Sequence, residues 1–86
     1  MLIRLNECVA ISDSGLLFNA RTGESFSVNP LGLTILQMIR NNRQKAEIRQ
    51  SLLEEYDVNA ETLDSHFEEF LLFLKRFKLI EFLPAS

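Results

Sequence analysis

Histidine and cysteine, two residue types that commonly take part in catalysis, are scarce in this chain. Its 86 residues include one histidine, His66, and one cysteine, Cys8. A catalytic centre needs a nucleophile, a base and an orienting group that converge on one point. We expect His66 to be a packing or surface residue of a helix, and Cys8 to be a small buried residue of a strand. The sequence therefore predicts a protein that is not an enzyme.

The same residue types limit the ligands that the chain can hold. A single cysteine cannot form an internal disulfide, and the sequence has no cluster of cysteine and histidine that would ligate a metal. The glycines Gly15, Gly23 and Gly32 match no phosphate-binding spacing. We therefore expect neither a metal ion nor a cofactor.

Charge and hydrophobicity argue against further classes of function. The formal net charge of −3 argues against non-specific binding to nucleic acid and against binding to an anionic membrane. The apolar runs are far shorter than the roughly 20 residues that cross a bilayer, and residues 1–4 lack the features of a signal peptide. These features favour a cytoplasmic location. A chain of this length suffices for one small domain, so we expect a single domain, residues 1–86.

The binding of a partner chain remains, and the first third of the sequence predicts strands that suit it. Alternation and turn residues indicate strands at residues 5–11, 16–19 and 25–28, with turns at residues 13–15 and 21–23. In the third strand, Phe26 and Val28 fall on one face and Ser25 and Ser27 on the other. This half-buried strand lies at an edge if the three strands form a simple meander.

Three helices are expected after the strands. Asn29 is a strong N-cap and Pro30 suits the first helical position, so the first helix begins there and ends at residues 41–42. A second helix runs from about Gln44 to Tyr56, and Asn59 caps a third helix of about 18 residues. Residues 79–82 have the composition of a short final strand.

The third helix carries more apolar surface than one core face needs. At 100° per residue, a core stripe centres on Phe67, and Leu72 points nearly opposite to it. His66, Phe73 and Phe77 cluster to one side of that stripe. These aromatic residues either pack against the strands or form a wall beside the edge strand, where an extended peptide would bind.

An edge strand beside an aromatic wall is sufficient to recognise a peptide. The open edge offers backbone N–H and C=O groups to any extended chain. Each such hydrogen bond contributes about 1 kcal/mol, so four or five of them fall short of the roughly 8 kcal/mol that micromolar affinity requires. Apolar anchors must supply the remainder and the specificity.

Basic residues surround the junction of the first two expected helices. They are Arg40, Arg43, Lys45 and Arg49. A group of charges like this is most often a solvated face. The alternative is a surface that meets an acidic peptide or a partner enzyme.

Three motifs of the sequence resemble those of the PqqD family. The first, G-x-x-F-x-V-N-P-x-G, begins at Gly23 and runs into the first helix. The second, I-x-x-x-L-x-x-E-Y-D-V, begins at Ile48, and the third, F-x-x-x-L-x-x-x-x-L-I, begins at Phe70. The resemblance covers roughly residues 8–82, and its most telling part is the turn at residues 55–58.

The resemblance implies a fold, a partner and a set of site residues. PqqD proteins are small domains that bind the leader of a ribosomally made precursor peptide and present it to a modifying enzyme. The implied fold is α+β and winged-helix-like, with a three-stranded antiparallel meander followed by three helices. The leader would pair antiparallel with the strand that precedes the first helix and pack on the third helix. The implied site residues are Glu24, Ser25, Phe26, Ser27, Val28, His66, Phe70, Phe73 and Phe77.

The segment from Phe18 to Gly23 looks especially like members of the family that are associated with enzymes related to the HPr kinase. The resemblance therefore implies a precursor peptide and a kinase-like modifying enzyme as partners.

Two other functions are compatible with the same elements. A winged-helix DNA-binding regulator needs a basic recognition helix, whereas the first half of the third helix carries Glu61, Asp64, Glu68 and Glu69. A structural dimerisation module would use the edge strand for a second copy of the chain. The sequence favours the peptide-binding adaptor and leaves a homodimer open.

Overall fold

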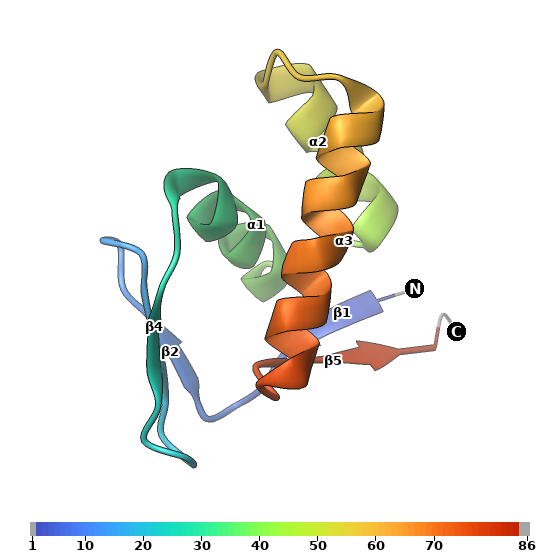
Figure 1. Ribbon diagram of the computed structural model, residues 1–86. Coiled ribbons are helices and arrows are strands. Elements are labelled where there is room, and N and C mark those ends of the chain that lie inside the picture. Colours follow the sequence, from blue (N-terminus) through green and yellow to red (C-terminus); the bar gives the residue numbers. More distant parts are fainter. Residues whose placement is uncertain (1, 85–86) are drawn as a thin grey trace.

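The fold consists of a three-stranded antiparallel meander, three helices and a second sheet formed by the two ends of the chain (Figure 1). The computed structural model describes residues 2–84, so residues 1 and 85–86 of the predicted domain lie outside the described part. The α+β class and the order of meander and helices are confirmed. The elements are β1 (Leu2–Leu5), β2 (Val9–Ile11), β3 (Leu16–Asn19), β4 (Ser25–Ser27), α1 (Pro30–Arg40), α2 (Lys45–Glu55), α3 (Ala60–Arg76) and β5 (Ile80–Leu83).

The meander has the order β2, β3, β4, and the central strand fixes which face is buried. Leu17 of β3 is fully buried and lies opposite Ile11 on one side and Phe26 on the other. The turn before β3 depends on Gly15, which has a φ of 91°. A Cβ at this position would lie 2.8 Å from the carbonyl oxygen of Val28, so only glycine fits between the turn and the end of β4.

The prediction of one continuous first strand over residues 5–11 is wrong. The structure breaks it into β1 and β2 at a turn in which the backbone N–H of Val9 donates to the carbonyl oxygen of Asn6 at 3.1 Å. Glu7, the charged residue that interrupts the apolar alternation, lies in this turn. Cys8 also lies in the turn and is partly exposed, so the expectation that it is a buried residue of a strand is wrong.

The two ends of the described chain pair with each other. β1 and β5 form an antiparallel ladder in which Leu5 lies opposite Ile80, and Figure 1 shows the two strands side by side. Ile3 and Ile80 of this ladder are buried in the core. The short apolar segment after the third helix is therefore a strand, as its composition suggested.

The helices begin and end near the predicted residues because their caps are local. The side-chain oxygen of Asn29 accepts a hydrogen bond from the N–H of Gly32 at 2.8 Å, and that of Asn59 accepts one from Glu61 at 2.8 Å. The backbone N–H of Gln44 donates to the carboxylate of Glu47 at 3.0 Å and completes a capping box for α2.

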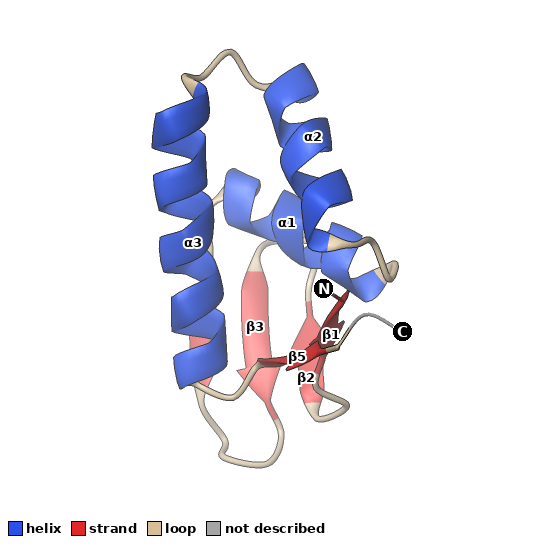
Figure 2. Cartoon of the chain, turned by 90° about the vertical axis from the view of Figure 1, so that its right-hand side faces the viewer, coloured by secondary structure: helices blue, strands red, loops and turns tan. Residues whose placement is uncertain are grey.

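All three helices contribute to one hydrophobic core, and α3 runs along one side of the molecule, with α1 and both sheets beside it (Figure 2). Leu72 points away from this core and is 65% exposed, as the helical wheel predicted. The buried residues are Ile3, Leu17, Ile35, Leu36, Ile39, Ile48, Leu52, Leu63, Phe67, Leu71, Leu74, Leu79 and Ile80. No helix within residues 2–84 has the length and apolar character needed to cross a membrane.

Two of the four basic residues near the junction of α1 and α2 form ion pairs between α2 and α3. Arg49 donates from Nε to Asp64 Oδ1 at 2.5 Å, and Lys45 Nζ lies 2.5 Å from Glu68 Oε1. The guanidinium hydrogen bond is the main reason why the pKa of Asp64 is lowered and that of Arg49 raised. The basic group therefore serves in part to hold the two helices together.

Candidate functional site

β4 is an edge strand whose outer backbone groups point away from the meander. The N–H of Asn19 donates to the carbonyl oxygen of Glu24 at 2.9 Å, and the N–H of Val28 donates to that of Gly15 at 2.8 Å. Bonded and non-bonded residue pairs alternate in an antiparallel ladder, so the backbone of Phe26 faces β3. The N–H and C=O groups of Ser25 and Ser27 consequently face the open side, where no strand of residues 2–84 pairs with them.

Four phenylalanine rings form a continuous wall beside this edge. The ring centroid of Phe26 lies 5.5 Å from that of Phe73 and 5.0 Å from that of Phe77. Phe73 also lies 6.3 Å from Phe70 and 5.2 Å from Phe77. We call Phe26, Phe70, Phe73 and Phe77 the aromatic wall. All four rings are half-buried, so they pack on one another and on the core while keeping part of their surface exposed.

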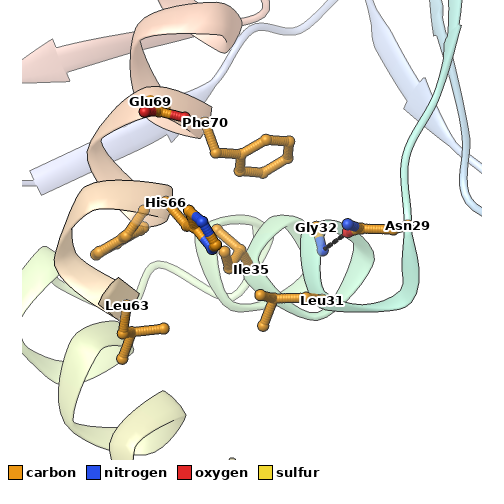
Figure 3. Close-up of a pocket in the computed structure, with 9 residues that line it drawn as sticks. Asn29, Leu31, Gly32, Ile35, Leu63, His66, Glu69 and Phe70 are labelled. Carbon is orange, nitrogen blue, oxygen red and sulfur yellow. Dashed lines mark hydrogen bonds between the residues drawn. The ribbon is translucent and has the colours of Figure 1, made fainter. Parts of the chain in front are cut away.

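A pocket of about 310 Å³ lies between α1 and α3 at one end of this wall (Figure 3). Its interior is mostly apolar, whereas His66 and Glu69 at the pocket are exposed. The lining residues are Asn29, Leu31, Gly32 and Ile35 from the α1 side and Leu63, His66, Phe67, Glu69 and Phe70 from α3.

Gly32 keeps the pocket and the wall in contact. A Cβ at this position would lie 3.1 Å from the ring of Phe70 and 3.1 Å from the Cβ of Val28. The absence of a side chain therefore lets the ring of Phe70 lie close against the first turn of α1. Because Phe70 belongs to both the wall and the pocket, the two features form one surface. We call the open edge of β4, the aromatic wall and the pocket together the β4–α3 surface.

The structure brings most of the predicted site residues to the β4–α3 surface. Ser25 and Ser27 supply the open backbone groups, the four phenylalanines form the wall, and His66 lines the pocket. Glu24 differs from the two serines, because its carbonyl oxygen faces β3 and accepts from the N–H of Asn19. Its side chain is exposed beside the edge, but its carbonyl is not available for pairing.

Sequence reasoning did not identify most of the pocket. The sequence predicts only a capping role for Asn29, and it does not single out Leu31, Gly32, Ile35 or Leu63 as site residues. The signal available in the sequence was Gly32, since a glycine in the first turn of a helix indicates that another element approaches closely.

The residues with catalytic potential are not brought together. His66 lines the pocket between α1 and α3, whereas Cys8 lines a separate polar pocket of about 240 Å³ with Arg21 and with the ion-paired side chains of Arg4 and Glu81. No group of three or more histidine, cysteine, aspartate or glutamate side chains within residues 2–84 has the arrangement of a metal site. The β4–α3 surface therefore combines open backbone groups with partly exposed aromatic rings, and within residues 2–84 His66 and Cys8 line different pockets.

Comparisons with known proteins relate this geometry to solved structures. TbiB1 in complex with the TbiA(beta) leader peptide has a TM-score of 0.83 and 22% sequence identity, over 95% of this chain and 99% of that chain. A lasso peptide synthetase B1 complexed with the leader peptide has a TM-score of 0.77 and 27% identity, over 95% of this chain and 98% of that chain. No curated protein matches the sequence.

The family assignment rests on the sequence. The model of the family described as coenzyme PQQ synthesis protein D (PqqD) matches residues 15–80 of the 86-residue chain. The matched region extends from the turn before β3 to the first residue of β5, so it contains the whole β4–α3 surface. The chain belongs to the PqqD family.

Proposed function

We propose that this protein is a non-enzymatic peptide-binding adaptor. It binds the leader of a ribosomally made precursor peptide by strand addition at β4 and presents that peptide to a separate modifying enzyme. The observation that carries the proposal is the open edge at Ser25 and Ser27, which lies directly beside the aromatic wall. Backbone pairing and apolar anchoring are therefore available to one extended chain.

The magnitudes show that both parts of the surface are needed. Ser25 and Ser27 offer four backbone groups, which at about 1 kcal/mol each contribute about 4 kcal/mol. Micromolar affinity requires about 8 kcal/mol. A buried aliphatic or aromatic anchor contributes about 1.5–3 kcal/mol, so one anchor on the wall and one in the pocket supply the difference before the costs of association. Selectivity for a peptide then resides in the anchors.

Strand polarity sets which part of the peptide reaches the pocket. β4 continues through Val28 to Asn29, which lines the pocket. A peptide that pairs antiparallel with β4 runs in the opposite direction, so its residues before the paired segment lie toward the pocket. We expect an apolar anchor on the N-terminal side of the paired residues.

The solved relatives support the proposal through what they bind. Both TbiB1 and the lasso peptide synthetase B1 were solved with leader peptides. A separate modifying enzyme as the recipient of the peptide, a kinase-like enzyme in particular, and a cytoplasmic location stay predictions from the sequence.

A DNA-binding regulator is disfavoured by the charges on α3. Glu61, Glu68 and Glu69 are exposed on this helix, and Lys45 and Arg49 are engaged with carboxylates of α3. A helix that enters the major groove needs free basic side chains to neutralise phosphates. Absence of a gel shift at low salt is the expected result.

The test is an NMR amide-shift titration of the ¹⁵N-labelled chain with leader peptides encoded beside its gene. Shifts concentrated on β4, on the aromatic wall and around the pocket would support the adaptor. Shifts confined to the polar pocket around Cys8, or a gel shift with DNA, would contradict it. A concentration series by light scattering in parallel reveals whether a second copy of the chain occupies the β4 edge instead.

A further inference from the structure

The meander has an exposed apolar face on the side opposite to the core. Leu16 and Phe18 of β3 are 46% and 42% exposed, although Leu17 between them is fully buried. Ala10, Ser25 and Ser27 lie across from these residues on the same side. We call Ala10, Leu16, Phe18, Ser25 and Ser27 the outer face. Charged residues make up 24% of the chain, yet none of the five is charged. The centre of a protein interface has the same depletion of charge.

The strand register gives the outer face a definite relation to the open edge. Leu16 is paired with Ser27, and Phe18 is paired with Ser25. Both are non-hydrogen-bonded pairs, in which the two side chains lie closest. Each large apolar side chain of β3 is therefore separated from the open edge by one small serine.

An added strand would place half of its side chains on this face. Residues directly opposite each other in a ladder point to the same side of the sheet. A peptide residue opposite Phe26 thus points toward the aromatic wall, whereas the residues opposite Ser25 and Ser27 point outward. We call the peptide position opposite Ser27 position a, the one opposite Phe26 position b and the one opposite Ser25 position c.

The serines leave room for the outward residues to reach β3. Neighbouring strands lie about 4.8 Å apart, so the added strand and β3 would be separated by about 9.6 Å. Two long apolar side chains that lean toward each other can meet across this distance only where the residue between them is small. Ser25 and Ser27 meet this condition, since both are small and exposed.

We propose that the outer face is a second recognition surface for the same peptide. Large uncharged side chains at positions a and c pack over Ser27 and Ser25 and contact Leu16 and Phe18, while position b binds the aromatic wall. The preferred ligand is therefore an extended peptide with three consecutive large uncharged residues. The proposal rests on strand addition at β4 and adds selectivity from the side of the sheet that faces away from α3.

The probe is an mRNA-displayed library of random 12-residue peptides, selected on the immobilised wild-type chain. Backbone NOEs from the tightest selected peptide to Ser25 and Ser27 define its positions a, b and c. The expected result is enrichment of large uncharged residues at all three positions. Enrichment at position b alone would overturn the proposal and leave the proposed function intact. Enriched peptides without contacts to β4, or no enriched peptides, would overturn both.

Matched variants of the chain separate the two outward positions. Leu16→Thr should weaken binding of the selected peptide by up to about 5-fold, because one apolar contact worth up to about 1 kcal/mol is lost. It should also remove the effect of replacing position a by serine, while position c keeps its effect. Phe18→Thr should do the reverse. Threonine suits an exposed strand position, so both variants should fold, which circular dichroism verifies.

Two other occupants of the outer face would give different results. A second copy of the chain would make the wild type dimeric in sedimentation experiments and both variants monomeric. A docking site for the modifying enzyme would leave peptide affinity unchanged in both variants while modification of the peptide is lost. Either result overturns the proposal.

Discussion

Phe73 is the residue on which the aromatic wall depends. Its ring contacts those of Phe26, Phe70 and Phe77, at centroid distances of 5.5, 6.3 and 5.2 Å. Phe73→Ala should weaken binding of a cognate leader peptide about tenfold or more, since a central aromatic anchor contributes at least about 1.4 kcal/mol. Fluorescence polarisation with a labelled leader measures the change. The variant should remain folded because the ring is only half-buried.

Leu72→Ala provides the matched control for this prediction. Leu72 precedes Phe73 in the same helix but is 65% exposed, so its truncation should leave the affinity unchanged. If a folded Phe73→Ala variant bound the leader as tightly as the wild type, the wall would have no part in recognition. The same result would restrict the site to the edge and the pocket.

The ion pair between Arg49 and Asp64 should make the stability of the fold depend on pH in the acid range. The hydrogen bond from the guanidinium holds the pKa of Asp64 below its ordinary value. A lowered carboxyl pKa stabilises the fold above the unfolded value of about 3.9, and this contribution is lost as the pH falls through the folded pKa. Thermal melts from about pH 6 to about pH 2 should therefore show a fall in Tm that is steeper for the wild type than for Asp64→Asn.

Arg49→Gln tests the assigned cause. Without the guanidinium, the pKa of Asp64 should return toward its ordinary value, so Arg49→Gln and Asp64→Asn should show the same shallow dependence of Tm on acid pH. Equal slopes in the wild type and both variants would mean that this half-exposed pair contributes nothing to stability.

Neighbouring residues of β4 direct their backbone groups to opposite sides of the strand. The N–H of Ser25 faces the open side, whereas the backbone of Phe26 faces β3. Ser25→Pro should leave the fold intact, because proline is tolerated at the first residue of an edge strand. It should nevertheless abolish most of the peptide binding, since the edge loses a donor and the ring obstructs an incoming strand. Isothermal titration with a cognate leader measures this loss.

Phe26→Pro should abolish binding for a different reason. This substitution removes a donor to β3 and one ring of the wall, so it should also lower the Tm and disturb the meander. A Ser25→Pro variant that bound normally would show that the peptide does not pair with β4, whatever the behaviour of Phe26→Pro.

Sequence reasoning succeeded where the determinants of an element are local. Asn29, Pro30 and Asn59 indicated where α1 and α3 begin because a cap bonds within its own first turn. It failed at β1, whose partner β5 lies at the other end of the described chain. No local pattern near residues 2–5 identifies a partner that distant, so residues 5–11 were joined into one strand.

The candidate site was predictable to a different extent on its two faces. The alternation of serine and phenylalanine in residues 25–27 correctly predicts which face of β4 is exposed. Residues 16–19, in contrast, are mostly apolar, so their sequence does not show which face of β3 is exposed. The exposure of Leu16 and Phe18 required the three-dimensional register. The pairing of Lys45 and Arg49 with α3 likewise depends on packing between helices.

For the whole molecule, the pairing of the chain ends supports the site without belonging to it. The chain leaves α3 and turns, with the N–H of Leu79 donating to the carbonyl oxygen of Leu74 at 2.8 Å, and then enters β5. Ile80 at the start of β5 is 3% exposed and lies opposite Leu5. The ladder of β1 and β5 therefore fixes the end of α3 that carries Phe77.

Ile80→Ala should lower the free energy of unfolding by about 2–4 kcal/mol, as removal of a buried isoleucine side chain does. Phe82→Ala is the matched control on the same strand. The ring of Phe82 is only half-buried, with its centroid 5.4 Å from Nζ of Lys75, so its removal should lower the free energy of unfolding by less. Urea unfolding measures both variants. At temperatures where Ile80→Ala is still folded, its affinity for the leader should equal that of the wild type, in contrast to Phe73→Ala. A weaker affinity in the folded Ile80→Ala variant would mean that the chain ends adjust the β4–α3 surface as well as stabilise it.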